Sequence, residues 1–350
     1  MTSTRSTIPP LLESYLRLPP ETSLILLTGT LGCSVSWVVA RFAGRVLQQG
    51  AGRDGLGGRD RSHRGVGGEG EWGGENADGV GNGGAGESGQ GVDVLLVSWM
   101  RDLAFWKSEI RRGGGVDITK LMKKDADADE NESSGGRFTF VDCFTTLSSL
   151  PQNDEDALLA ELETRITAAI TSQRPSPTQH QTPPRRRRKK ILILDAPSLL
   201  PTLSLLTALN LSTLLLRLRA LPEIHSTLLT CPSDLPLLSA AITKSSAAGE
   251  SRQRQEVEVE SAAFVVQQAG VARWVLGVRE LETGAAGDVS GVLRVSRGGG
   301  GYADGSEEWE GEGGSGEKEG AAEEVREMEV LYLVRRDGSA RVFERGADGL

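Results

Sequence analysis

The stretch that decides the fold is residues 24–42, which read LILLTGTLGCSVSWVVARF. It begins with four aliphatic residues and continues through a glycine-containing turn. It then places apolar side chains at helical spacing, at Trp37, Val38, Phe42 and, just beyond, Val46. A buried strand, a tight turn and a helix in that order form the opening unit of an α/β domain.

The same alternation of strand and helix continues along the chain. Further strands are predicted at 92–99, 137–144, 191–195 and 227–230, and helices at 103–112, 154–172, 202–221 and 257–274. Four more strands are predicted at 275–282, 292–297, 329–336 and 339–344. The last two flank Asp337-Gly338, a dipeptide typical of hairpin turns. We therefore expect an α/β fold with a mainly parallel sheet, helices on both faces and an antiparallel C-terminal hairpin.

Glycine-rich and polar segments interrupt this pattern. Many of the 45 glycines fall in 50–91 and 298–325, and residues 172–190 are polar and basic. Such segments bury too little apolar surface to offset the entropy of ordering them. We expect all three to be disordered, 172–190 as a basic linker, and the whole chain, 1–350, to contain a single domain.

Composition and cysteine usage narrow the function classes. The net charge of -9 argues against a protein that binds nucleic acid over its whole surface, although a local basic patch remains compatible with it. Cys33, Cys143 and Cys231 lie on separate apolar segments without a CxxC pair. We expect these cysteines to be reduced and buried, which suits a protein of the cytoplasm or nucleus. We expect no metal and no other cofactor.

One segment allows a membrane alternative. Residues 22–40 carry no charge, but the segment is short for a membrane span and contains several polar residues and glycines. We expect no membrane association, and a protein anchored through residues 24–40 is kept as an alternative.

The turn after the first strand lacks the chemistry of a nucleotide site. A phosphate-binding loop needs Gly-Lys-Ser/Thr, whereas Thr28 to Ser34 read TGTLGCS and the chain contains no Gly-Lys dipeptide. Asp195 ends an aliphatic strand, as the magnesium-binding aspartate of an ATPase does, but without the lysine we interpret it as a loop cap. We therefore assign no catalytic residue.

Basic residues offer candidate contacts with RNA. Arg111 and Arg112 on a helix, and Arg294 and Arg297 on a late strand, are expected to line a surface groove. The run from Arg185 to Lys190 suits RNA phosphates, an import receptor or a solvated linker, and the sequence leaves these open. The aromatic residues Trp99, Phe105 and Trp106 are expected in the core, with base stacking as the alternative.

Three segments together resemble subunit 6 of the Elongator complex in its fungal form. They are VLLVSWMRDLAFW at 94–106, RELETGAAGDVSGVLRVSR at 279–297, and LYLVRRDGSARVFERG at 331–346. The stretch from Glu-Thr-Gly to Asp-Val-Ser-Gly is the most specific part.

The resemblance implies a RecA-like, P-loop-type fold without its own P-loop lysine. In that family, subunits 4, 5 and 6 form a hetero-hexameric ring that binds tRNA and supports modification of the wobble uridine, U34, by catalytic subunits 1 to 3. The family lends no catalytic residue and no cofactor. An active RecA-like ATPase of recombination or chaperone type is the alternative.

Overall fold

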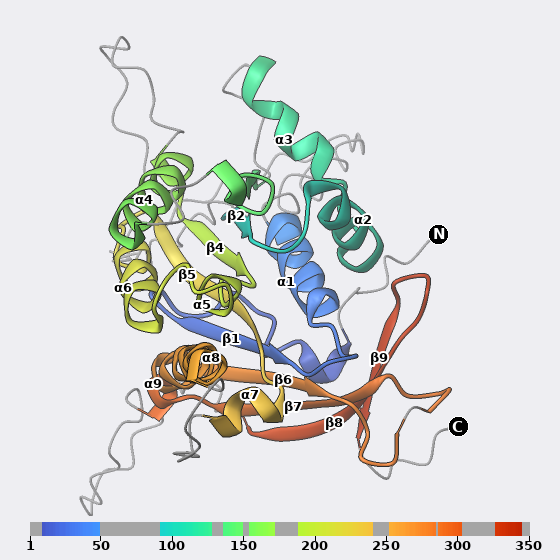
Figure 1. Cartoon of the computed structure of the whole chain (residues 1–350). Coiled ribbons are helices and arrows are strands. Elements are labelled where there is room, and N and C mark those ends of the chain that lie inside the picture. The colour runs from blue at the N-terminus through green and yellow to red at the C-terminus, as the bar shows by residue number, and fades with distance from the viewer. Residues whose placement is uncertain are drawn as a thin grey trace, which may run out of the picture.

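The strands of the chain form one mixed sheet. The computed structural model describes residues 9–49, 92–127, 136–149, 154–171, 188–240, 252–284, 286–302 and 326–344. Within these ranges the strand order is β3-β2-β4-β5-β1-β6-β7-β8-β9 (Figure 1). The strands are β1 Leu24–Gly29, β2 Asp93–Ser98, β3 Phe138–Asp142, β4 Lys190–Asp195, β5 Ile224–Pro232, β6 Trp274–Arg279, β7 Gly291–Arg297, β8 Met328–Val334 and β9 Ala340–Glu344.

Parallel pairing dominates the N-terminal part of the sheet. Strands β1 to β6 pair in parallel, and β6 to β9 pair antiparallel. Strand β1 lies in the middle and is buried along most of its length, because both neighbours and both layers of helices cover it. The expected α/β class, with a mainly parallel sheet and an antiparallel C-terminal hairpin, is confirmed.

Helices cover both faces of the sheet. The α-helices are α1 Ser36–Gln49, α2 Leu103–Gly114, α3 Ile118–Asp127, α4 Glu155–Thr171, α5 Leu199–Thr202, α6 Ala208–Arg219, α7 Leu235–Ala240, α8 Arg252–Val271 and α9 Gly299–Tyr302, and short 3-10 turns lie at Pro10–Leu12 and Leu147–Ser149. One core packs α1 and α2 against the sheet, and the other packs α4, α5, α6 and α8 on the opposite face (Figure 1). Trp106 belongs to the first core and Trp99 to the second, so both are core residues as expected.

The leucine-rich region after β4 differs from its prediction. One helix over 202–221 was expected, but the chain forms α5 and then α6. Ser204 between them has a φ of 55°, which turns the backbone out of helical geometry. Thr207 then starts α6, because its side chain accepts a hydrogen bond from the Asn210 amide.

Other boundaries also differ from the sequence expectations. The range predicted for the linker, 172–190, runs into β4, because Lys190 is a buried residue of that strand. The expected disordered loop 298–325 begins with the ordered turn α9. Residues 50–91, 172–187 and 303–325 lie outside the described residues.

The segment 24–40 is no membrane anchor in this fold, because it contains the central strand β1 and the start of α1. Among the described residues, none of the helices combines the length and the apolar character that crossing a membrane requires.

The C-terminal hairpin docks its tip against α1 and α2. The buried Arg41 of α1 donates a hydrogen bond from Nη2 to the Gly338 carbonyl oxygen over 2.6 Å. Gly338 has a φ of 83°, and a Cβ added there would lie 2.1 Å from Cγ of Arg112. The turn therefore needs glycine for both its conformation and its close approach to α2.

Candidate functional site

The topology places a candidate site at the carboxyl end of β1. The chain leaves β1 through α1 toward β2 on one side, and it returns from β5 through α8 to β6 on the other. In open α/β sheets, ligands bind outside the carboxyl ends of the strands where the connections diverge in this way. The turn from Thr30 to Val35 follows β1 at this edge, and the carboxyl end of β4 lies two strands away, beyond β5.

The β1–α1 turn keeps the spacing of a phosphate-binding loop but not its residues. Counted from Gly29, the pattern G-x-x-x-x-G-K-[ST] places Ser34, Val35 and Ser36 at its last three positions. Val35 is buried, and its Cγ1 lies against Gly29. An apolar side chain therefore stands where the phosphate-binding lysine would lie, while the hydroxyl position keeps Ser36.

Carboxylates from two neighbouring loops occupy the turn. The Leu31 amide donates to Oδ1 of Asp234, after β5, over 2.6 Å. Glu280, after β6, places its carboxylate so close to Gly32 that an added Cβ would lie 2.2 Å from Oε1. The loop amides of a nucleotide site point at phosphate, whereas here one of them already binds an internal anion. Two negative charges at this position oppose the binding of a third.

The aspartate at the end of β4 is held by three side chains. Oδ1 of Asp195 accepts from Arg101 over 2.7 Å and from Thr230 over 3.1 Å, and Oδ2 accepts from Ser98 over 2.8 Å. Asp195 is fully buried, and the Arg101 side chain is 23% exposed. A guanidinium therefore supplies the positive charge that a magnesium ion would supply in an ATPase.

This network corrects the interpretation of Asp195 as a loop cap. Its carboxylate accepts from side chains at the ends of β2 and β5 and from Arg101, rather than from the backbone of its own loop. Burial raises the pKa of Asp195 above its ordinary value, while Arg101, Ser98 and Thr230 oppose that rise. The residue therefore joins three loops at the carboxyl edge of the sheet. This role was not predicted, because the side chains that bind Asp195 come from segments far away in the sequence.

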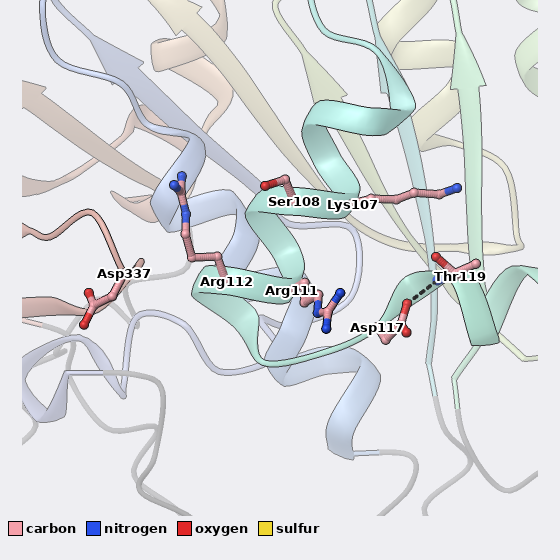
Figure 2. A pocket seen from close by; sticks show the side chains of 7 residues that line it. All are labelled: Lys107, Ser108, Arg111, Arg112, Asp117, Thr119 and Asp337. Atoms are coloured by element: carbon pink, nitrogen blue, oxygen red, sulfur yellow. Dashed lines mark hydrogen bonds between the residues drawn. The ribbon is translucent and has the colours of Figure 1, made fainter.

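Two of the four candidate RNA-binding arginines lie together. Arg111 and Arg112 line a surface hollow of about 650 Å³ at the end of α2. The other residues that line it are Lys107, Ser108, Asp117, Thr119 and Asp337 (Figure 2). The helix ends there because Gly115 adopts a left-handed conformation, and the arginines in its last turn suit the negative end of the helix dipole.

The two arginines of the hollow have different surroundings. Arg112 forms an ion pair with Glu109 and donates to the Arg336 carbonyl oxygen over 3.4 Å, so it supports the hairpin. Arg111 lies beside Asp117, and it contributes to lowering the pKa of that carboxyl, after the larger effect of hydrogen bonds from Thr119. Lys107 was missed from the sequence, although its position four residues before Arg111 places it on the same helix face.

The other two arginines do not join this hollow. Arg294 and Arg297 lie on β7, three residues apart, and side chains alternate between the faces of a strand. They therefore point to opposite faces of the sheet. Arg294 and Arg297 therefore lie apart from the hollow that Arg111 and Arg112 line.

Cys33, Cys143 and Cys231 are unpaired thiols and buried, as expected. Among the residues that the structure describes, histidine, cysteine and acidic side chains form no group of three or more suited to a metal ion.

Comparison with known proteins yields matches only among solved structures. No protein-family model matches the chain, and no curated protein matches it by sequence. Among solved structures, a KaiC-like protein from the hyperthermophilic archaeon Pyrococcus horikoshii is 12% identical, with a TM-score of 0.42, over 98% of this chain and 99% of that one.

The fold class follows from the sheet itself. A central β1 between β5 and β6, with β4 and β2 beyond β5, is the strand order of RecA-like domains. The chain is an α/β protein with a RecA-like fold.

Proposed function

We propose that this chain is a non-catalytic subunit of the Elongator complex, working in a hetero-hexameric ring with subunits 4 and 5. The ring binds tRNA and supports modification of the wobble uridine U34 by catalytic subunits 1 to 3, in the cytoplasm and the nucleus. The observation that carries the non-catalytic part is the state of the β1–α1 turn, where Val35 replaces the lysine. The resemblance of segments 94–106, 279–297 and 331–346 to subunit 6 supports the identity of the complex.

Phosphoryl transfer depends on positive charge at the transferred phosphate, from a lysine and a metal ion. Val35 supplies no charge, and Asp234 and Glu280 bring negative charge to the turn. Arg101 neutralises the carboxylate that would hold the metal. All three features disfavour the alternative of an active RecA-like ATPase.

Nucleotide binding and turnover by the purified chain test this part. We expect no ATP hydrolysis and no binding of a fluorescent ATP analogue in the presence of magnesium. Hydrolysis that disappears in Asp195→Ala would overturn the proposal. Co-expression with subunits 4 and 5 tests the ring, which we expect to contain two copies of each subunit by mass.

The hollow at the end of α2 is the proposed tRNA contact. Figure 2 shows Lys107 and Arg112 pointing to different sides of α2, with Arg111 between them. Cations arranged along a helix suit an extended polyanion better than one small anion, because they do not converge on a single point. Arg111 and Lys107 are the contacts that we assign to tRNA phosphates.

Titration of tRNA against the assembled ring tests this assignment. We expect Lys107→Ala with Arg111→Ala to weaken binding and to lower the salt slope by about one unit for each lost contact. Arg294→Ala is the control, because that arginine lies on β7, away from the hollow. Unchanged affinity in the double variant would remove the hollow from the tRNA site.

A further inference from the structure

Two strongly exposed leucines lie on adjoining loops at the carboxyl edge of the sheet. Leu31 follows β1 and Leu235 follows β5, and the two residues are 85% and 76% exposed. The loops are in contact, since the Leu31 amide binds Asp234 and the Ser233 amide donates to the Gly29 carbonyl oxygen over 2.9 Å. One exposed leucine is ordinary on a protein surface, whereas these two lie on loops that are hydrogen-bonded to each other, and we call the pair the apolar patch.

The backbone around this patch is held in place. The Thr30 amide donates to the Val278 carbonyl oxygen over 3.1 Å, and the Cys33 amide donates to the Thr30 carbonyl oxygen over 2.9 Å. Gly32 adopts a φ of 85°, which closes the turn beneath Leu31. Because the turn is already ordered, a partner that covers Leu31 loses little entropy in fixing it.

Carboxylates border the apolar patch. Asp234 accepts a hydrogen bond from the Leu31 amide and precedes Leu235 in the chain, and the Glu280 carboxylate lies close to Gly32. In the described part of the chain, neither carboxylate forms an ion pair. This charge repels nucleotides, nucleic acids and anionic lipid headgroups, and it favours a partner that carries lysine or arginine.

We infer that Leu31, Leu235, Asp234 and Glu280 form a docking surface for a protein partner that presents a basic side chain beside an apolar one. The partner's apolar side chain covers the two leucines, and its basic side chain pairs with the carboxylates. The surface occupies the position where a RecA-like ATPase would bind nucleotide. For the identity of the partner, this inference rests on the proposed function, which makes it subunit 4 or 5 of the ring.

The experiment measures association of the full chain with co-purified subunits 4 and 5 by titration at several salt concentrations. We expect Leu31→Ala with Leu235→Ala to weaken association by at least tenfold, as removal of central apolar contacts does. The matched control is Leu209→Ala with Leu216→Ala. These α6 leucines are 68% and 64% exposed, and α6 packs in the core on the sheet face opposite to α1. The control should associate as the unaltered chain does.

A second pair of substitutions tests the charge. Asp234→Asn and Glu280→Gln remove two negative charges while keeping oxygen acceptors, so the Leu31 amide keeps its partner. We expect this variant to lose most of the salt dependence of association. All variants should retain the circular dichroism spectrum of the unaltered chain, because the altered side chains lie at the surface.

The outcomes separate the two proposals. If the unaltered chain fails to associate with subunits 4 and 5, the proposed function is wrong. If it associates and the leucine variant binds as tightly as the unaltered chain, the docking surface is wrong and the proposed function stands. An equal loss in the α6 control, or an unchanged salt slope in the charge variant, would also overturn the docking surface.

Discussion

Replacement of Arg101 by methionine should destabilise the protein strongly, because it leaves the Asp195 carboxylate buried without a cation. The pair spans 2.7 Å, and the Asp195 side chain is 1% exposed. Breaking a buried ion pair by removal of one partner costs about 3 to 5 kcal/mol, and the partial exposure of Arg101 places the expected loss near the lower value. Methionine keeps an apolar stem against the Phe105 and Trp106 rings, over which the guanidinium now lies.

The loss should also depend on pH. Burial already raises the pKa of Asp195, and removal of Arg101 removes the main opposing charge. The folded variant then holds a proton that the unfolded chain releases above about pH 4. Stability of the variant should therefore increase as the pH falls through the raised pKa, and the difference from the unaltered chain should be largest at neutral and alkaline pH.

Urea unfolding at several pH values, followed by circular dichroism, measures both effects. Arg217→Met is the control, because Arg217 pairs with Glu163 over 2.9 Å at an exposed position and should contribute at most about 1 kcal/mol. Addition of Asp195→Asn to Arg101→Met should recover much of the loss, since it removes the buried charge. A cost below about 1 kcal/mol, with no dependence on pH, would refute the reasoning.

Two further predictions concern the hairpin turn and the cysteines. In urea unfolding, Gly338→Ala should destabilise the chain by about 2 kcal/mol more than Gly284→Ala does. Both glycines have a left-handed φ, but only a Cβ added at residue 338 would meet Arg112. Equal costs would show that the hairpin tip does not press on α2. Cys143 and Cys231 should resist alkylation by iodoacetamide at pH 8 until urea is added, because burial raises the pKa of Cys143 to about 12 and also raises that of Cys231. Mass spectrometry of the native protein that finds either thiol modified would contradict their burial.

The sequence was sufficient for the order of the strands and of most of the long helices, because each of these elements carries its own periodicity. The helices α3, α7 and α9 were not predicted. The apolar run before Asp195 and the alternation in the C-terminal strands require no knowledge of the rest of the chain. The break between α5 and α6 was missed, because leucines continue through it and only the backbone at Ser204 leaves the helical region. Local pattern therefore predicts an element better than it predicts where the element stops.

At the carboxyl end of β1, only the missing lysine could be predicted from the sequence. The lack of a lysine in the β1–α1 turn is visible in the sequence, whereas the contact between Arg101 and Asp195 joins residues 94 positions apart. Strand pairing creates that contact, and no single segment carries a sign of it. The four arginines illustrate the same limit, since alternation along β7 separates Arg294 from Arg297 although both are basic and close in sequence.

The features that fill the nucleotide position also have structural roles, which explains why one substitution would not restore a phosphate site. A lysine in place of Val35 would lose the packing of that side chain against Gly29 and would still meet Asp234 and Glu280. Removal of Arg101 to admit a metal would leave Asp195 without its partner and reduce stability. Each of these substitutions made alone therefore lowers stability without creating a phosphate site. A RecA-like sheet with its carboxyl edge filled in this way keeps the loops ordered there, which lowers the entropic cost of the protein contact proposed above.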